Sequence, residues 1–145
     1  NASGLSTFQG VSFTPGSIMK ETAYSGFTTG WQAAGDINLS NGNVQYNQHF
    51  LDGTANTLNI VSTVGINTDL KIAESISVTG ITSVRETVAY VNDITIDHAA
   101  VDVYWVGGSA PTAGGSGGYD TYTFNIVKIG NASYAVTGNQ TLTSA

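Results

Sequence analysis

The side chains with catalytic potential are few and are not spaced for a known reaction. The chain has two histidines, His49 and His98, and no cysteine, so it contains neither a closely spaced histidine pair for zinc nor a thiolate site. Asp97 beside His98 has the right chemistry to orient an imidazole toward a serine, but we predict no strained nucleophile elbow of the Gly-x-Ser-x-Gly type, which needs a sharp turn from a strand into a helix. A glycoside hydrolase needs a carboxylate pair at a set separation, and the sequence brings no two of its glutamates together: Glu21, Glu74 and Glu86. We predict no catalytic residues and no enzymatic activity.

Three aspartates offer a candidate ion site near a predicted turn. Asp93, Asp97 and Asp102 carry the oxygen ligands that calcium prefers. Their spacing does not fit the Asp-x-Asp-x-Asp-Gly loop, and solvated turn carboxylates are the favoured interpretation because aspartate is common in turns. The glycine-rich residues 107–118 lack the Gly-Lys-Ser/Thr ending of a phosphate-binding loop. We therefore predict no metal and no cofactor.

Aromatic side chains are the candidates for ligand contact. Trp31, Tyr46 and Trp105 would stack on sugar rings if they were exposed, since an aromatic face suits the apolar face of a pyranose. The alternative is that they pack in the core, as large aromatic residues generally do. If they are exposed, these three residues support one of two candidate functions, that of a carbohydrate-binding adhesion module for glycans of a host surface.

The composition excludes several classes of partner. Of 145 residues, 41% are hydrophobic and only 10% are charged, against about 25% charged in an ordinary soluble protein. The formal net charge of −6 would repel a nucleic acid backbone. No apolar run reaches the roughly 20 residues that span a bilayer, so we expect no membrane insertion. The surface must consist mainly of Ser, Thr, Asn, Gln and Gly, which is typical of extracellular β proteins and viral shells.

The elements that must position these residues are predicted to be strands. Polar and apolar residues alternate over residues 75–79, 94–96, 101–105 and 122–126, which indicates half-buried strands. Turn dipeptides separate them, and Asn41-Gly42 predicts a hairpin that joins residues 37–40 to 44–50. Residues 107–118 are predicted to be a loop, and any helix, such as one near 70–74, is limited to about one turn. The fold class is therefore all-β, an antiparallel β-sandwich of jelly-roll-like form with nine or ten short strands.

The first residues are set apart from the sandwich. We assign residues 1–15 to an N-terminal β arm or linker and residues 16–145 to the sandwich domain. An arm would expose four apolar side chains that need a partner to cover them, and we predict that these are oligomer contacts: Leu5, Phe8, Val11 and Phe13. The alternative, that the segment adds an edge strand to its own sandwich, is equally compatible with the sequence.

Several stretches resemble a group of structural proteins from marine tailed phages that infect cyanobacteria. They are Trp105-Val-Gly-Gly-Ser-Ala-Pro111, Tyr119-Asp-Thr-Tyr-Thr-Phe-Asn-Ile-Val-Lys128, Ala132-Ser-Tyr-Ala-Val-Thr-Gly-Asn-Gln-Thr141, Gly-Ser-Ile-Met-Lys-Glu at 16–21 and Asn-Leu-Ser-Asn-Gly-Asn-Val at 38–44. Gly4-Leu-Ser-Thr-Phe8 is similar to a short repeat that precedes such modules. The resemblance covers nearly the whole chain and implies a virion structural role, in a tail fibre or another particle protein, with no catalytic residues to carry over.

Together these features predict a non-enzymatic phage virion protein, a module of a fibre, an appendage or a capsid decoration on the outer surface of the particle. Its expected partners are copies of itself, other virion proteins and, in the alternative, a host-surface glycan. A trimer is the expected homo-oligomer because trimers are common in fibres. The residue pattern itself does not indicate the number of subunits. Subunit contacts would add stability by burying apolar surface.

Overall fold

The computed structural model describes residues 36–50, 55–84 and 89–144, and the side chains of 48–50 lie outside this description. These residues form two mixed β sheets and one short helix, so the all-β prediction is confirmed. The proposed arm at 1–15 lies outside the described residues. So do five of the residues predicted to make contacts: Leu5, Phe8, Val11, Phe13 and Trp31.

The two sheets differ in size and in the strands that form them. The first has the order β1-β3-β5-β6 and contains β1 (Asp36–Asn38), β3 (Ala55–Val61), β5 (Tyr90–Ile96) and β6 (Ala99–Ala100). The second has the order β2-β4-β8-β9-β7 and contains β2 (Val44–Phe50), β4 (Ser75–Ser83), β8 (Tyr119–Gly130), β9 (Ser133–Thr141) and β7 (Val103–Trp105). A 3-10 turn, η1 (Leu39–Asn41), follows β1, and the helix α1 (Ile66–Asp69) follows β3.

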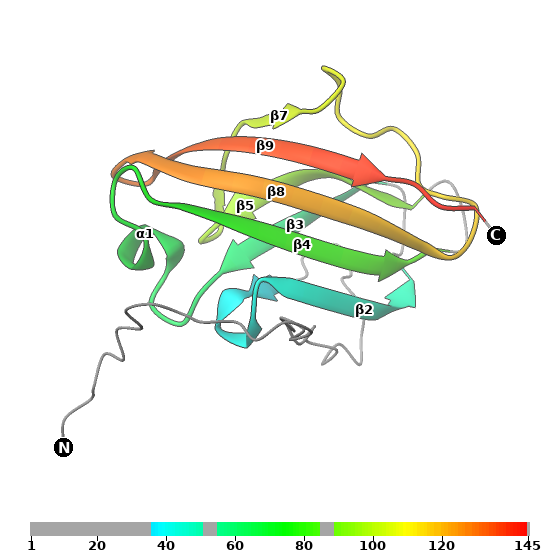
Figure 1. The fold of residues 1–145 in the computed structure, drawn as a ribbon, viewed down its shortest axis with the longest axis horizontal. Coiled ribbons are helices and arrows are strands. Elements are labelled where there is room, and N and C mark those ends of the chain that lie inside the picture. Colours follow the sequence, from blue (N-terminus) through cyan, green and yellow to red (C-terminus); the bar gives the residue numbers. More distant parts are fainter. Residues whose placement is uncertain (1–35, 51–54, 85–88, 145) are drawn as a thin grey trace, which may run out of the picture.

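One hydrophobic core lies between the sheets, and strand alternation places residues in it. β3 and β5 contribute Leu58, Ile60, Ile94 and Ile96, and the opposite sheet contributes Val78, Tyr122, Phe124, Ile126 and Val136. In Figure 1, β4, β8 and β9 cross in front of β3 and β5. The predicted alternation at 75–79, 94–96 and 122–126 falls within β4, β5 and β8, because every second side chain of a half-buried strand faces the core.

The sheets are mixed, so the wholly antiparallel arrangement expected from the sequence is wrong for the described strands. Four of the seven strand pairs are parallel: β1 with β3, β3 with β5, β2 with β4, and β7 with β9. The physical reason is the chain path. From β1 to β5, consecutive strands alternate between the two sheets, so a strand pairs with the one two places along, which runs in the same direction.

The hairpin predicted at Asn41-Gly42 is also wrong. β1 and β2 belong to different sheets, and η1 lies between them. Gly42 has a φ of 113°, its N–H donates to the Leu39 carbonyl over 3.0 Å, and the Asn38 side chain accepts from the Ser40 N–H over 3.0 Å. The Asn-Gly pair supplies a turn with a positive φ, as its chemistry predicts, but this turn carries the chain from one sheet to the other.

The glycine-rich loop is confirmed as a loop, since β7 ends at Trp105 and β8 begins at Tyr119. This loop is not exposed along its whole length. Gly114 and Gly115 are buried, and the buried Asp120 carboxylate accepts from the Gly115 N–H over 2.8 Å and from the Thr143 N–H over 3.1 Å. The second half of the loop is therefore packed against the end of the sandwich.

The helix α1 is a single turn, as the sequence predicted, although it lies at 66–69 and not at 70–74. The Asp97 carboxylate accepts from the Ile66 and Asn67 N–H groups over 2.9 and 3.0 Å at its start. At its end the Lys128 ammonium donates to the Leu70 carbonyl over 2.9 Å. No helix in the described part of the chain has the length and apolar character needed to cross a membrane.

Candidate functional site

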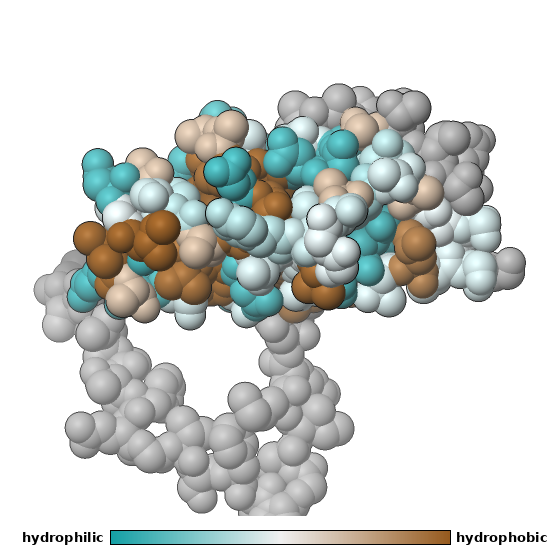
Figure 2. Space-filling view, turned by 90° about the horizontal axis from the view of Figure 1, so that it is seen from above, coloured by the Kyte–Doolittle hydropathy of each residue, from teal (hydrophilic) through white to brown (hydrophobic). Residues whose placement is uncertain are grey.

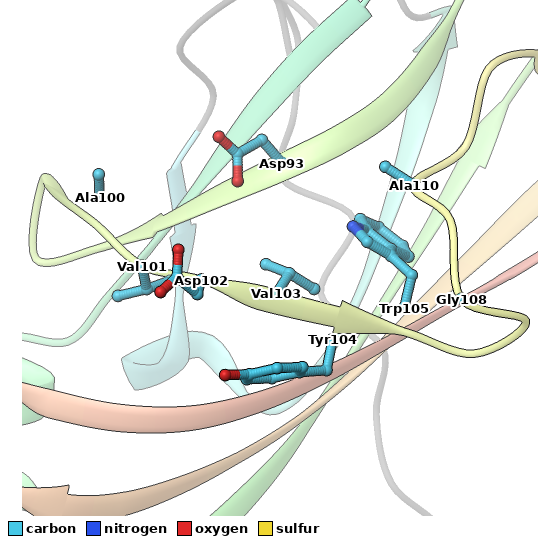
Figure 3. A pocket seen from close by; sticks show the side chains of 9 residues that line it. All are labelled: Asp93, Ala100, Val101, Asp102, Val103, Tyr104, Trp105, Gly108 and Ala110. Carbon is cyan, nitrogen blue, oxygen red and sulfur yellow. The ribbon is translucent and has the colours of Figure 1, made fainter.

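A groove of about 640 Å³ opens between β5 and the segment that contains β7. Asp93 comes from β5, whereas Asp102, Val103 and Trp105 come from β7 and the residue before it, and Gly108 and Ala110 come from the glycine-rich loop. β5 and β7 belong to different sheets, so the groove lies where the two layers of the sandwich diverge (Figure 3). Its volume is within the range of ordinary ligand sites.

The groove combines two exposed carboxylates with two aromatic residues, Tyr104 and Trp105. Asp93 and Asp102 are both exposed, and the Asp93 Oδ1 atom accepts from the N–H of Ile94 over 2.9 Å. In Figure 3 the Asp93 carboxylate and the nitrogen edge of Trp105 point toward the same hollow, with Val103 between them on β7. Acceptors and one N–H donor therefore surround an apolar floor.

Trp105 is held in place by a close fit against the sheet. Its ring packs edge-on against Phe124 with a centroid distance of 5.8 Å and an interplanar angle of 72°. In the register it lies opposite Gly138 of β9, where an added Cβ would stand 3.0 Å from Trp105 Cε3 and 2.8 Å from Val103 Cγ1. Glycine at 138 thus leaves the space that the indole ring fills, and Trp105 is a core residue on one side and a groove residue on the other.

Tyr104 faces the other way. It is 67% exposed and lies on the opposite side of β7 from Val103 and Trp105 (Figure 3), as strand alternation requires. There it lines a second, smaller hollow of about 320 Å³ with Ile129 and Tyr134. Tyr104 also borders the first groove, so it lies between the two hollows.

The outer face of the five-stranded sheet is a second candidate surface. We define it as the solvent-side residues of β4, β8 and β9: Ser75, Ser77, Thr79, Ile81, Ser83, Tyr119, Thr121, Thr123, Asn125, Val127, Ile129, Ser133, Ala135, Thr137, Asn139 and Thr141. None of them is charged. The two charged residues of β8, Asp120 and Lys128, are buried on the other side.

Apolar side chains gather at one end of the molecule. Figure 2 shows hydrophobic residues concentrated at its left, the end at which α1 lies in Figure 1, and paler, mixed polarity elsewhere. Ile72 and Ile129 are 65% and 58% exposed. The Ala73 N–H donates to the Lys128 carbonyl over 2.8 Å, which brings these two isoleucines to the same end. Ile129 continues the outer face into this apolar end.

The structure separates Tyr46 from Trp105, so the two residues do not form a single aromatic glycan platform. β2 and β7 are the opposite edge strands of the second sheet. Tyr46 lies on β2 opposite Ile81, and its ring packs against Tyr119 at a centroid distance of 5.4 Å. A hydrogen bond with Tyr119 is the main cause that raises the pKa of Tyr46 above 10.0. Of the two described aromatic candidates, Trp105 is the one that lines the groove between β5 and β7.

The Asp97 carboxylate does not orient the imidazole ring of His98. Both residues have positive φ values, 50° and 66°, and make the tight turn between β5 and β6. The Asp97 carboxylate binds the start of α1, whereas His98 Nδ1 lies 2.9 Å from Asn59 Nδ2. The pair therefore has a structural role in this turn.

The three aspartates of the candidate ion site are also divided. Asp93 and Asp102 line the groove, while Asp97 is used at α1. Within the described ranges, no three His, Cys, Asp or Glu side chains come close enough to hold a metal ion. The groove itself was not foreseen, because nothing local in the sequence brings Asp93 next to Trp105.

Comparison with protein-family models, with curated proteins and with solved structures finds no match for this chain. The likeness to phage structural proteins stays a prediction from the sequence, and function is argued below from the two surfaces.

Proposed function

We propose that this chain is a non-enzymatic structural module of a phage particle, part of a fibre, an appendage or a surface decoration, and that it associates with copies of itself. The observation that carries the proposal is the uncharged outer face of β4, β8 and β9. The resemblance of the sequence to virion proteins supports the same role. A homo-oligomer on the outside of the particle is the expected state.

The outer face suits contact between copies because it avoids their mutual repulsion. A formal charge of −6 makes two copies repel each other in most orientations. Residues such as Thr79, Thr123 and Thr137 carry no charge, and the hydrogen bond that the Ser77 hydroxyl donates to the Asn125 side-chain oxygen over 2.7 Å is neutral. Hydroxyl and amide groups can pair across such a contact directly or through water.

In the described part of the chain, the charged side chains near the groove and the loops bind backbone groups or are exposed. Asp97 and Asp120 bind backbone N–H groups, and Lys128 binds backbone carbonyls. The acid of a glycoside hydrolase depends on a carboxyl in apolar surroundings, whereas Asp93 and Asp102 are both exposed. These features support a binding or structural role over a catalytic one.

Sedimentation of a charged variant tests the proposal. Thr123 lies in the outer face, paired with Thr79 on one side and Asn139 on the other. We expect the wild-type chain to sediment as an oligomer and Thr123→Glu to shift it toward monomer by at least tenfold in the association constant. Thr112→Glu, in an exposed loop position, is the matched control and should leave the oligomer intact. A wild-type monomer, or an oligomer that Thr123→Glu does not weaken, would overturn the role of this face.

A further inference from the structure

We propose that the groove between β5 and β7 binds the uncharged terminal unit of a glycan. The site combines Asp93, Asp102 and the indole N–H of Trp105 around an apolar floor that includes Val103 and Ala110. None of the described residues that line it belongs to the outer face of β4, β8 and β9. Glycan binding is thus independent of the self-association proposed above.

The chemistry of the lining matches a sugar. Each sugar hydroxyl can donate to a carboxylate and accept from an N–H group, and the groove offers carboxylate acceptors from Asp93 and Asp102 with a donor on Trp105. Hydrogen bonds to charged acceptors are the stronger kind. The C–H face of the sugar ring can lie against the indole edge of Trp105 and against Val103. A few polar groups converging on an apolar floor is the usual composition of a small-molecule site.

The size of the groove limits the ligand to one or two sugar units. Its volume of about 640 Å³ exceeds what a single ordered water or metal ion requires and lies within the 300–1,000 Å³ of small-molecule sites. Because the lining carboxylates are exposed, part of a bound sugar stays in contact with water. We therefore expect millimolar affinity for one unit, which several copies in one particle would raise by avidity.

The charge of the groove selects among glycans. Asp93 and Asp102 place two negative charges in the lining, and the described residues that line the groove include no Lys, Arg or His. A sialylated or sulfated unit would meet like charges on entry and lose affinity. Neutral hexoses and N-acetylhexosamines have no such penalty, so they are the predicted class.

Titration with methyl glycosides tests the site. We expect methyl hexosides or N-acetylhexosaminides to give saturable shifts in the NMR spectrum of the full chain at millimolar concentration, with sialic acid and glucose 6-sulfate giving none. Asp93→Ala and Asp102→Ala should each weaken binding at least tenfold. Trp105→Phe keeps a ring over Gly138 but removes the N–H donor, so it should weaken binding without unfolding the chain.

The control is a neighbouring exposed residue that is not among the described residues of the groove. Val106→Ala shortens a side chain that is 69% exposed and should leave the affinity unchanged. Tetramethylammonium chloride serves as a cationic probe, because an acidic groove with an indole also suits a cation. Binding of that probe in place of sugars, or binding of the anionic sugars alone, would overturn the proposal. So would the absence of any sugar binding at 20 to 50 mM (on the order of a weak single-site affinity), or loss of binding in Val106→Ala alone. Sedimentation of the same variants should match wild type, which separates this result from the test of self-association.

Discussion

At the scale of single residues, the buried and half-buried charges Asp97, Asp120 and Lys128 satisfy backbone groups. Asp97 accepts from two N–H groups at the start of α1, and Lys128 donates to a carbonyl at its end. Asp120 binds the glycine-rich loop and the segment after β9. A buried charge is tolerated when hydrogen bonds replace its water. Since loops of irregular backbone leave such groups unpaired, these residues fix the loops at both ends of the sandwich.

Because Tyr122 is buried, the free energy of unfolding depends on pH in the alkaline range. The pKa of Tyr122 is raised to about 12, and burial is the main cause. The hydrogen bonds from Val91 N–H and Gln140 lower this pKa, and the nearby Asp120 charge raises it. An unfolded tyrosine has a pKa of 10.0. The neutral phenol therefore stabilises the fold fully below pH 10, and this contribution is lost as the pH rises from 10 through about 12.

We expect the free energy of unfolding to fall by up to about 1.4 kcal/mol per pH unit in that window. Urea unfolding followed by circular dichroism at about pH 9, 10, 11 and 12 measures the slope. Tyr122→Phe should start less stable, because two hydrogen bonds are lost, but should show a flatter pH dependence. Tyr104→Phe, an exposed site, should keep the wild-type slope. An unchanged slope in Tyr122→Phe would contradict this assignment.

At the scale of elements, the sequence predicted strands better than it predicted their partners. Alternation located β4, β5 and β8, because each buries every second side chain in the core. The parallel pairs could not be predicted, because the partner of a strand depends on the sheet in which the preceding turn places that strand. Asn41-Gly42 has the chemistry of a hairpin turn, yet it connects two sheets. The groove also depends on how the chain passes between the two sheets. The sequence therefore identified Trp105 as an aromatic candidate but could not predict that Asp93 lines the same groove.

The glycine-rich loop gives the clearest test of an element's packing. A Cβ at Gly115 would stand 2.2 Å from the Thr143 carbonyl oxygen and 2.5 Å from Asp120 Oδ1. Gly115→Ala must therefore displace either the backbone or the buried carboxylate, and we expect a loss of about 3 kcal/mol. At Gly107, with a φ of +92°, an added Cβ meets nothing within 4 Å, so Gly107→Ala should cost about 1 kcal/mol through backbone strain alone. Thermal unfolding of both variants measures the difference, and equal losses would show that the second half of the loop is not packed as described.

At the scale of the whole molecule, the path of the chain ties the two sheets into one unit. From β1 to β5 consecutive strands alternate between the sheets, and a single core lies between them. Neither sheet can therefore separate without exposing the inward side chains of the other. Cooperative unfolding in one step is the physical consequence.

Phe124 tests this coupling because it belongs to the core and also supports Trp105 in the groove. Phe124→Ala should lower the free energy of unfolding by about 3 to 5 kcal/mol through lost burial and a residual cavity. Phe124→Leu, which keeps most of the volume, should lose less than about 1.5 kcal/mol and remains measurable if the alanine variant does not fold. Tyr104→Ala, on the exposed side of β7, should change stability by about 0.5 kcal/mol or less. Far-UV circular dichroism follows the strands and near-UV dichroism follows aromatic packing, and the two transitions should coincide in every variant. Two separate transitions in the wild type or in Phe124→Leu would mean that the sheets unfold independently, which the shared core and the alternating chain path do not allow.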